Sequence, residues 1–552
     1  MRKAFLGTFA AASLVSTSAF ASNVTEFPDN GSEQMGRGGA WVARASDPLA
    51  TQYNPAGLAG QPTRLTLQVS LPFAQTCFHR LRDTAHGDST ADNVLLESDG
   101  LHYPKVCDDT GTFPVPNLGL TIRAHKRLGI GILVNAPSGA ASQAWPEFST
   151  ATSGAQYPAP ERYLATYTNA FFLTPTLGVG WEPVDNLRIG ASFIAGIANA
   201  TFSNGSLANN SGQDPRLNDI KATLSTSTAF VPGGTIGILW SATPMLDLAG
   251  WYKISAPIDT SADVKTFANY YNLGQTVTQG DSSQPGCVPT GQAPTGTCSP
   301  GLGHVKLPVP MEAKIGVRFH KPRRGLAIEG AELHRRDPMA QDVWDLELNV
   351  TWANDSAIDT LQIRFPGTAD GTNGVIPVAG TPGTVPPNAD IPHNYNDVIG
   401  VRLGGDYNAV PNRLAIRAGA FFESAAAPNT NGQNTTMATD FMAGNRVGLA
   451  LGATLRIPLK KDAPPTEGGA LEFSLGYMHM FVTDLSNDGS QGGIRALAGT
   501  ACETGTPVTQ GNQLICNPGP NQYPAFRTTW FANLGTISNS LDVINIGASY
   551  RF

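Results

Sequence analysis

Charged side chains are set singly among the polar positions of many alternating segments of this sequence. The cations are Arg123, Arg188, Lys253, Lys314, Arg318, Arg402, Arg417 and Arg456, and the anions are Asp247, Glu312, Asp345, Glu347, Asp406 and Glu472. Two chemistries are open to such a set. The charges can pair with each other and hold an internal segment, or one or two unpaired cations can bind a substrate carboxylate by charge-assisted hydrogen bonds. Arg318 and Arg402 are the candidates for the second role.

Motifs of catalysis are absent from the sequence. It contains no HExxH, G-x-S-x-G or P-loop pattern, and its histidines are scattered. We therefore expect no enzyme activity, no cofactor and no metal. The net charge of −7 is mild and no block of Lys and Arg stands out, so nucleic-acid binding has no support.

Six cysteines form three close pairs: Cys77 with Cys107, Cys287 with Cys298, and Cys502 with Cys516. Each pair falls in a polar, Gly/Pro/Asn-rich stretch. An even number of cysteines in an exported chain predicts disulfides, each closing one loop. A metal site is the alternative, but no CxxC spacing or neighbouring His cluster supports it.

Residues 1–21 have the pattern of a secretory signal peptide. Arg2 and Lys3 precede a short apolar run, and Ala19-Phe20-Ala21 forms a small-x-small cleavage site. A membrane helix needs about 20 consecutive apolar residues, and nothing after position 22 supplies them. The mature chain is therefore either soluble or a barrel, and the strand pattern has to decide.

Strict alternation of apolar with polar or small residues recurs along the chain and predicts strands between an apolar and a polar medium. The predicted strands are 63–74, 115–125, 128–136, 166–182, 187–202, 224–241, 245–265, 306–320, 342–365, 395–409, 413–423, 443–459, 469–482 and 540–552. A soluble sandwich also alternates, but its strands usually run about 5–6 residues. These runs match the 9–11 residues or more that cross a bilayer at a tilt.

Short and long connections alternate between these segments, as in outer-membrane barrels with short periplasmic turns and long outer loops. The tight ones are Val184-Asp185-Asn186, Thr243-Pro244 and Pro411-Asn412. About 14 strands is an even number, so both chain ends lie on the periplasmic side and the last strand, ending at Phe552, pairs with the first. We expect an all-β transmembrane antiparallel barrel over residues 63–552, with long extracellular loops.

Residues 22–62 do not alternate and are rich in Gly, Ala, Asn and Pro. A barrel of this width has a lumen that is either water-filled or plugged. Since the segment carries Trp41, Leu49, Tyr53 and Leu58 and little charge, we expect it to fold into the lumen as a plug. A disordered periplasmic tail is the alternative.

The order of several landmarks resembles the FadL/TodX family of outer-membrane transport proteins. The landmarks are the signal peptide, Gly36-Arg37-Gly38-Gly39-Ala40, Asn54-Pro55-Ala56-Gly57-Leu58, Pro116-Asn117-Leu118-Gly119-Leu120, Asn135-Ala136-Pro137-Ser138-Gly139, Leu307-Pro308-Val309-Pro310, Tyr395-Asn396-Asp397 and Tyr477-Met478-His479. The resemblance implies 14 strands, an N-terminal hatch and a lateral opening where the third strand kinks inward. By position, Asn54, Pro55 and Ala56 match the hatch motif.

Asn135, Pro137 and Gly139 match the end of the kinked strand in that family. Pro137 lacks an N–H and Gly139 tolerates positive φ, so the strand ladder should break there. The alternative is that Pro137 and Gly139 simply begin a loop. The three cysteine pairs are not a general feature of the family.

The resemblance implies a monomeric channel for passive uptake of hydrophobic small molecules, with long-chain fatty acids as the first expectation and lateral release through the wall. Aromatic-hydrocarbon uptake, a general diffusion porin and a structural or adhesive surface barrel are the alternatives. The expected partners are the hydrophobic ligand, outer-membrane lipid and lipopolysaccharide, and the barrel-assembly machinery, with no nucleic acid.

Overall fold

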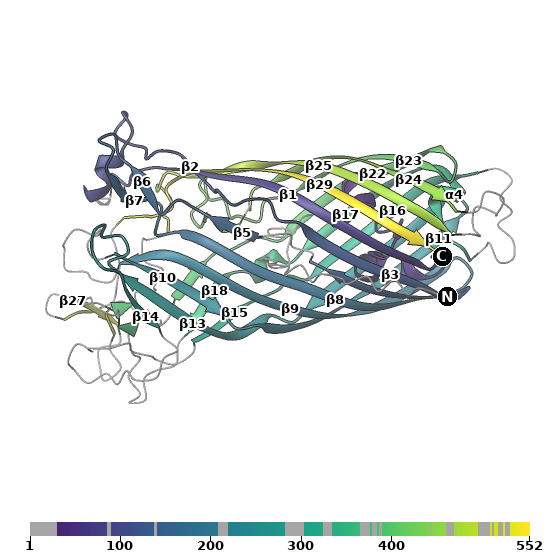
Figure 1. The fold of residues 1–552 in the computed structure, drawn as a ribbon, viewed down its shortest axis with the longest axis horizontal. Helices are drawn as coiled ribbons and strands as arrows, with labels where there is room; N and C mark the ends of the chain where they lie inside the picture. Colours follow the sequence, from purple (N-terminus) through teal and green to yellow (C-terminus); the bar gives the residue numbers. More distant parts are fainter. Residues whose placement is uncertain are drawn as a thin grey trace, which may run out of the picture.

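The fold was analysed in a computed structural model of the chain, shown in Figure 1. The structure describes residues 30–85, 90–136, 141–207, 219–281, 303–323, 334–364, 376–377, 384–385, 389–441, 443–459, 469–494, 508–510, 513–516, 523–524 and 530–552. The predicted signal peptide lies outside these residues.

Fourteen antiparallel strands form a closed barrel. In order around the wall they are β1 (Arg64–Arg80), β3 (Val115–His125), β4 (Leu128–Asn135), β8 (Ala165–Val184), β9 (Leu187–Leu207), β11 (Ala229–Thr243), β12 (Leu246–Ser255), β16 (Glu312–Pro322), β17 (Asp342–Ala353), β22 (Val398–Val410), β23 (Leu414–Glu423), β24 (Arg446–Pro458), β25 (Ala470–Asn487) and β29 (Gly535–Arg551). The last strand pairs with the first along its whole length, from Arg64 opposite Arg551 to Arg80 opposite Gly535. The predicted strand number and closure are confirmed.

Five of these strands continue toward the long-loop end as separate strands after a short break. The continuations are β10 (Asp219–Thr226), β13 (Ile258–Ala268), β15 (Gly303–Leu307), β18 (Thr360–Arg364) and β21 (Ala389–Pro392). The predicted segments 224–241, 245–265, 306–320 and 342–365 therefore each span parts of two strands. In the second of them Pro257 lies at the break, where it has no N–H to donate to a ladder.

The structure also contains short strands, helices and 3-10 turns besides the wall strands and their continuations. They are β2 (Val106–Cys107), β5 (Ala141–Ala144), β6 (Phe148–Thr150), β7 (Gln156–Pro158), β14 (Thr278–Asp281), β19 (Ile376–Pro377), β20 (Thr384–Val385), β26 (Val508–Gln510), β27 (Gln513–Cys516), β28 (Tyr523–Pro524), the 3-10 turns η1 (Pro55–Leu58), η2 (Thr90–Leu95) and η4 (Asp355–Ala357), and the short helices α1 (Ser32–Gly36), α2 (Ala50–Tyr53) and α4 (Pro338–Gln341). No helix among the described residues is both long and apolar enough to cross a membrane.

The two faces of the wall differ as the alternation predicts. Outward side chains such as Leu177, Ile315 and Leu451 are 55–63% exposed, while their sequence neighbours facing the lumen are largely buried or are glycine. A continuous apolar exterior on a closed sheet requires a hydrocarbon surrounding rather than water. The tight turns at 126–127, 185–186 and 244–245 lie at one end together with the C-terminus, which makes that end periplasmic (Figure 1).

Residues 30–62, called the inner segment below, lie inside the wall. Nearly all of them are buried, and their helical turns contact strands on different sides of the barrel. Turn η1 packs on β8, β9 and β11, whereas α1 packs on β23, β24 and β25. The inner segment thus lies inside the wall and contacts strands on different sides of the barrel.

Candidate functional site

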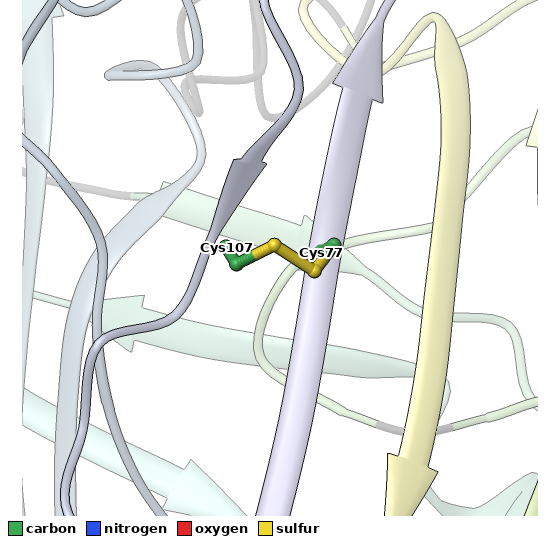
Figure 2. The surroundings of a disulfide bond; sticks show 2 residues. All are labelled: Cys77 and Cys107. Atoms are coloured by element: carbon green, nitrogen blue, oxygen red, sulfur yellow. A yellow bond between two sulfur atoms is a disulfide. The ribbon is translucent and has the colours of Figure 1, made fainter.

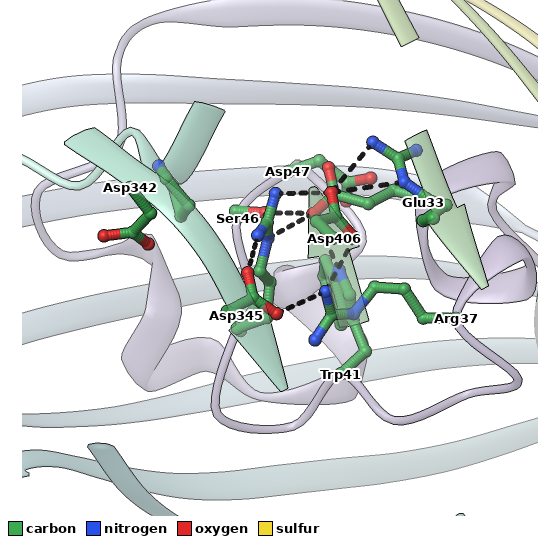
Figure 3. Close-up of polar contacts among 12 residues, drawn as sticks. Glu33, Arg37, Trp41, Ser46, Asp47, Asp342, Asp345 and Asp406 are labelled. Atoms are coloured by element: carbon green, nitrogen blue, oxygen red, sulfur yellow. Dashed lines mark hydrogen bonds and ion pairs between the residues drawn. The ribbon is translucent and has the colours of Figure 1, made fainter. Parts of the chain in front are cut away.

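An ionic cage joins the inner segment to the wall. The Arg37 guanidinium donates to Asp345 at 2.6 Å and to Asp406 at 2.7 Å, and Arg44 contacts the same two carboxylates. The side chains of Arg37, Asp345 and Asp406 are fully buried. Figure 3 shows Arg37 beside the carboxylates of Asp345 and Asp406, which come from the neighbouring strands β17 and β22. The cage anchors the segment by charge rather than by apolar packing.

Backbone donors of the inner segment are satisfied by side chains of β17. Glu347 accepts from the N–H of Ala43 at 2.8 Å and of Arg44 at 3.0 Å. Asn349 accepts from the N–H of Trp41 at 2.9 Å. These residues belong to a non-regular stretch with few backbone partners of its own, so the strand supplies the acceptors that buried N–H groups require.

The predicted hatch motif packs against inward-facing glycines of the wall, Gly180, Gly190 and Gly237, called the glycine bed below. Asn54 caps η1 by accepting from Ala56 N–H at 3.2 Å and donates to the carbonyl of Val42 at 2.7 Å. A Cβ at Gly190 would lie 2.2 Å from the Pro55 carbonyl carbon, and one at Gly237 would lie 2.0 Å from Asn54 Oδ1. Inward-facing glycines therefore let the motif approach the wall closely.

The third strand of the wall, β4, ends at Asn135, and β5 begins at Ala141. Asn135 pairs with Thr174 and Ala141 pairs with Ala170, so a step of six along the third strand matches a step of four along β8. Asn135 is buried and donates to the Tyr53 hydroxyl at 3.3 Å, which connects the break to the inner segment. Pro137 and Gly139 lie outside the described residues.

The neighbouring wall is incomplete beside this break. Strand β1 pairs with β3 only as far as Ser70, which is opposite Val115. Beyond it, Phe73, Ala74 and Gln75 are exposed in succession, so the alternation of buried and exposed side chains is lost. Within the part of the chain that the structure describes, no strand pairs with residues 71–75 on the β3 side.

A disulfide bounds this gap on its outer side. Cys77 of β1 is bonded to Cys107 of β2, as Figure 2 shows. The same segment continues across the wall, since the N–H of Asp108 donates to Thr76 at 2.8 Å and the N–H of Asp109 donates to Ala144 at 3.0 Å. The Cys77–Cys107 prediction is confirmed. Cys287, Cys298 and Cys502 lie outside the described residues, so the pairings of Cys287 with Cys298 and of Cys502 with Cys516 stay predictions.

The outer half of the lumen has an apolar lining. Buried inward side chains there form one cluster, called the outer apolar cluster below. Its members include Phe78 of β1, Phe172 of β8, Val231 of β11, Ile258 of β13, Val398 of β22 and Ile537 of β29. A second cluster, with Phe421, Met478, Met480, Leu541 and Val543, packs against Met35 of the inner segment. The outer half therefore has one apolar cluster, and a separate one contacts the inner segment.

The two cations predicted to bind a carboxylate differ in their contacts. Arg318 pairs with Asp247 at 2.9 Å, with Asp345 at 3.1 Å and with Asp342, deep in the periplasmic half. Arg402 pairs with Glu423 and lies 4.8 Å over the ring of Phe421, beside the apolar lining. Arg402 also donates to the carbonyl of Gly38 in the inner segment at 3.3 Å. The contacts of both arginines therefore match the alternative role, in which these charges pair with each other and hold an internal segment.

Lys314 lies at the boundary between the two halves. Its ammonium is 5.0 Å from the ring of Trp251 and 5.5 Å from that of Tyr53. Its ion pair with Glu312 is long, at 4.0 Å, whereas Lys253 is 2.6 Å from the same carboxylate. The charge of Lys314 is therefore less fully compensated by Glu312 than that of Lys253.

One carboxylate of the inner segment has an unusual environment. Asp47 accepts from Leu49 N–H at 2.8 Å and faces a polar cavity that Glu33, Arg64 and Arg417 also line. Burial, followed by the charge of Glu33, raises the pKa of Asp47 to about 7. Asp47 is therefore the weakly compensated charge of the inner segment.

Sequence reasoning did not identify the glycine bed as functional. Gly180, Gly190 and Gly237 were only small residues on polar strand faces, and their role depends on what lies against them. A signal existed, because inward glycines recur on the adjacent strands β8, β9 and β11. Leu541 was also not singled out, and Met478 was noted only as part of the landmark Tyr477-Met478-His479, although both are buried in the cluster that contacts Met35.

The fold and the surface define an outer-membrane-type β-barrel with an internal N-terminal segment. No family model and no curated protein sequence matches the chain. Among solved structures, a Pseudomonas aeruginosa FadL homologue is similar, with 14% identity over 96% of this chain and 100% of that chain and a TM-score of 0.63.

Two hydrocarbon channels are also similar in fold. The Pseudomonas putida toluene transporter TodX has 13% identity over 96% of this chain and 99% of its own, with a TM-score of 0.53. The CymD monoaromatic hydrocarbon channel has 13% identity over 97% of this chain and 99% of its own, with a TM-score of 0.52. At these identities the likeness is one of fold, and at that level the resemblance predicted from the sequence is confirmed.

Proposed function

We propose that this chain is an outer-membrane channel for the passive uptake of hydrophobic small molecules. The observation that carries the proposal is the apolar lining of the outer lumen, which a channel for polar solutes would not have. An apolar molecule arriving from outside gains about 0.8 kcal/mol for each CH₂ it buries, so such a lining can capture it.

The inner segment acts as the plug in this proposal, with Asn54, Pro55 and Ala56 as its hatch motif. Its buried ionic cage and its close contact with the glycine bed support this role. Bilayer conductance tests this role. We expect little steady current through the purified protein, and a large steady open-pore current would instead favour a general diffusion porin.

Release is proposed to be lateral, through the wall beside the third-strand break at Asn135, Pro137 and Gly139. Residues 71–75 of β1, which no described strand pairs on the β3 side, border that break, and Phe78 of the outer apolar cluster lies on the same strand. Leaving sideways lets an alkyl chain pass into lipid without returning its methylenes to water. A path through the inner segment would cross buried charges instead.

Long-chain fatty acids are the proposed substrate class. Lys314 and Arg402 place positive charge next to aromatic and apolar side chains, an arrangement that suits a carboxylate attached to an alkyl chain. Arg318 is the third candidate, although three carboxylates surround it. The hydrocarbons named for TodX and CymD are the second class, and they need no cation.

Binding of a fluorescent polyene fatty acid and of its methyl ester to detergent-purified protein separates these classes. We expect Lys314→Met and Arg402→Met each to weaken the acid about tenfold and leave the ester unchanged, because about 1.4 kcal/mol of charge-assisted bonding is lost. Lys306→Met, on an exposed outward position of β15, is the control.

Equal effects on acid and ester would remove the carboxylate contact and favour hydrocarbons as substrates. Unchanged binding of the acid in Arg318→Met would remove Arg318 from the candidates. If the acid, the ester and toluene all fail to bind the wild-type protein, the proposed function is wrong.

A further inference from the structure

The connection between β16 and β17 differs from the other described connections at the periplasmic end. Those at 126–127, 185–186 and 244–245 are tight turns, whereas β16 ends at Pro322 and β17 begins at Asp342. Residues 324–333 lie outside the described part. The remainder, His334–Gln341, turns inward with α4 at the end where the C-terminus lies (Figure 1).

Most of His334–Gln341 is buried, and it contacts the inner segment from the periplasmic side. Arg336 donates its backbone N–H to Gly60 at 2.9 Å and its guanidinium to the carbonyl of Ala43 at 2.9 Å. Gly60 has φ +85°, and a Cβ there would lie 2.3 Å from the carbonyl oxygen of His334. The contact is therefore close enough that only glycine fits without a shift.

The same segment is tied to opposite sides of the wall. On one side, His334 Nδ1 lies 2.9 Å from Glu182 of β8. On the other, Asp337 accepts two hydrogen bonds from Arg456 of β24, both at 3.0 Å, and contacts Arg551 of β29. Eight strand steps separate β8 from β24 in one direction around the fourteen-strand wall, so these contacts span the mouth.

We propose that His334–Gln341 is a periplasmic latch, which closes the lumen beneath the inner segment and holds that segment in place. Passage of any solute toward the periplasm would have to break the Asp337 ion pairs and the Arg336 contacts together. These charges are buried, so a partner left behind is costly to expose or to leave unpaired. For hydrophobic cargo, where the inference rests on the proposed function, the latch leaves the wall as the exit.

The latch also borders the polar cavity that contains Asp47. Asp337, Pro338 and Met339 line it from the latch, while Glu33, Arg44, Ser46 and Asp47 line it from the inner segment. Close packing holds the segment at Gly60, but at this cavity there is unfilled space next to the ionic cage. Loss of the latch would therefore let the segment shift along this side first.

Planar-bilayer conductance of the full chain tests the latch without any hydrophobic ligand. We expect Asp337→Asn to raise the ion current at least tenfold over wild type and to speed hydrogen exchange across residues 30–62. Asp185→Asn is the matched control, because it removes a carboxylate that pairs with Arg127 on an exposed turn at the same end. Gly60→Ala disturbs a different contact of the latch, the close approach of Gly60 to the His334 carbonyl oxygen, and should change current and exchange in the same direction.

Heat modifiability on a gel identifies any variant whose barrel does not form. The variant that does fold then tests the latch. Wild-type current and exchange in a folded Asp337→Asn or Gly60→Ala protein would overturn the latch while leaving the proposed function intact. A large steady current through wild type would overturn the latch and the plugged channel together. A variant that conducts ions but still binds the fatty acid would show that the substitution had released the latch and left ligand binding intact.

Discussion

The two halves of the lumen differ in their buried side chains: apolar clusters occur in both, but the ionic cage lies in the periplasmic half. The periplasmic half holds the inner segment by buried ion pairs, as between Arg37 and Asp345, and by backbone hydrogen bonds to side chains of the wall. The outer half presents Phe172, Val231 and other apolar side chains instead. Buried charges demand specific partners, whereas apolar surface is non-directional. The inner half is therefore suited to hold one segment, and the outer half to accept many apolar molecules.

The largest effect is expected from the ionic cage. Arg37→Met leaves Asp345 and Asp406 with less compensation in a buried site, which typically costs about 3–5 kcal/mol. We expect protease cleavage within residues 30–62 to increase while hydrophobic-ligand binding persists. Arg127→Met, which removes an exposed pair worth about 0–1 kcal/mol, is the control. Unchanged protection in Arg37→Met would contradict a division of the lumen into an ionic and an apolar half.

Removal of the Cys77–Cys107 bond should come next. A disulfide closing a loop of this length typically contributes about 2–4 kcal/mol. In Cys77→Ser/Cys107→Ser we expect faster hydrogen exchange at residues 106–109 and faster release of bound ligand, because the segment that bounds the wall gap is loosened. Exchange in β24 and β25 serves as the internal control. Equal exchange at 106–109 with and without the bond would separate the bond from the gap.

Met478→Gln tests the apolar half. Met478 is fully buried in the cluster that meets Met35, and burying such a side chain is worth about 1.5–3 kcal/mol. We expect roughly tenfold weaker binding of both the fatty acid and its methyl ester, with the inner segment still protected. Leu475→Ala on the lipid-facing side of the same strand should leave binding alone. Binding that is as strong in Met478→Gln as in wild type would place the ligand elsewhere.

Gly190→Val tests the close contact at the hatch motif. The added side chain would collide with Pro55, and overpacking of this kind costs about 1–3 kcal/mol. We expect increased ion current as the motif is displaced. Gly250→Val provides the comparison, since its Cβ would face outward with nothing nearer than 3.3 Å. Identical currents for the two variants would show that the glycine bed is not needed.

The smallest effect concerns Asp47 and pH. Its pKa is raised to about 7 in the folded protein, from an ordinary value near 4, so the folded state holds a proton that the unfolded state releases. Stability should therefore fall as pH rises from about 4 to about 7 and stay level above that. Asp47→Asn should flatten this decline in thermal unfolding measured across the range. A decline of the same size in the variant would assign it to other groups.

The two-residue alternation of apolar and polar side chains made the strands of the wall predictable from the sequence. Alternation depends only on which side of a strand each residue faces, so the strand number, the closure and the inward position of residues such as Arg318 followed without knowledge of partners. The breaks inside 224–241 and 245–265 were missed, because the apolar pattern resumes directly after each of them.

Only the tertiary structure could decide which side chains meet across the lumen. Arg37 and Asp345 lie about 300 positions apart in the sequence, and no local rule selects Asp345 over another inward carboxylate. Gly190 and the segment His334–Gln341 are also uninformative by themselves, because their roles arise from chain packed against them. The sequence by itself determined an apolar exterior and a polar interior, since each residue meets its solvent locally. The structure decided which interior charges pair, where the strand pairing of the wall is interrupted and what His334–Gln341 contacts, because these depend on contacts between distant segments.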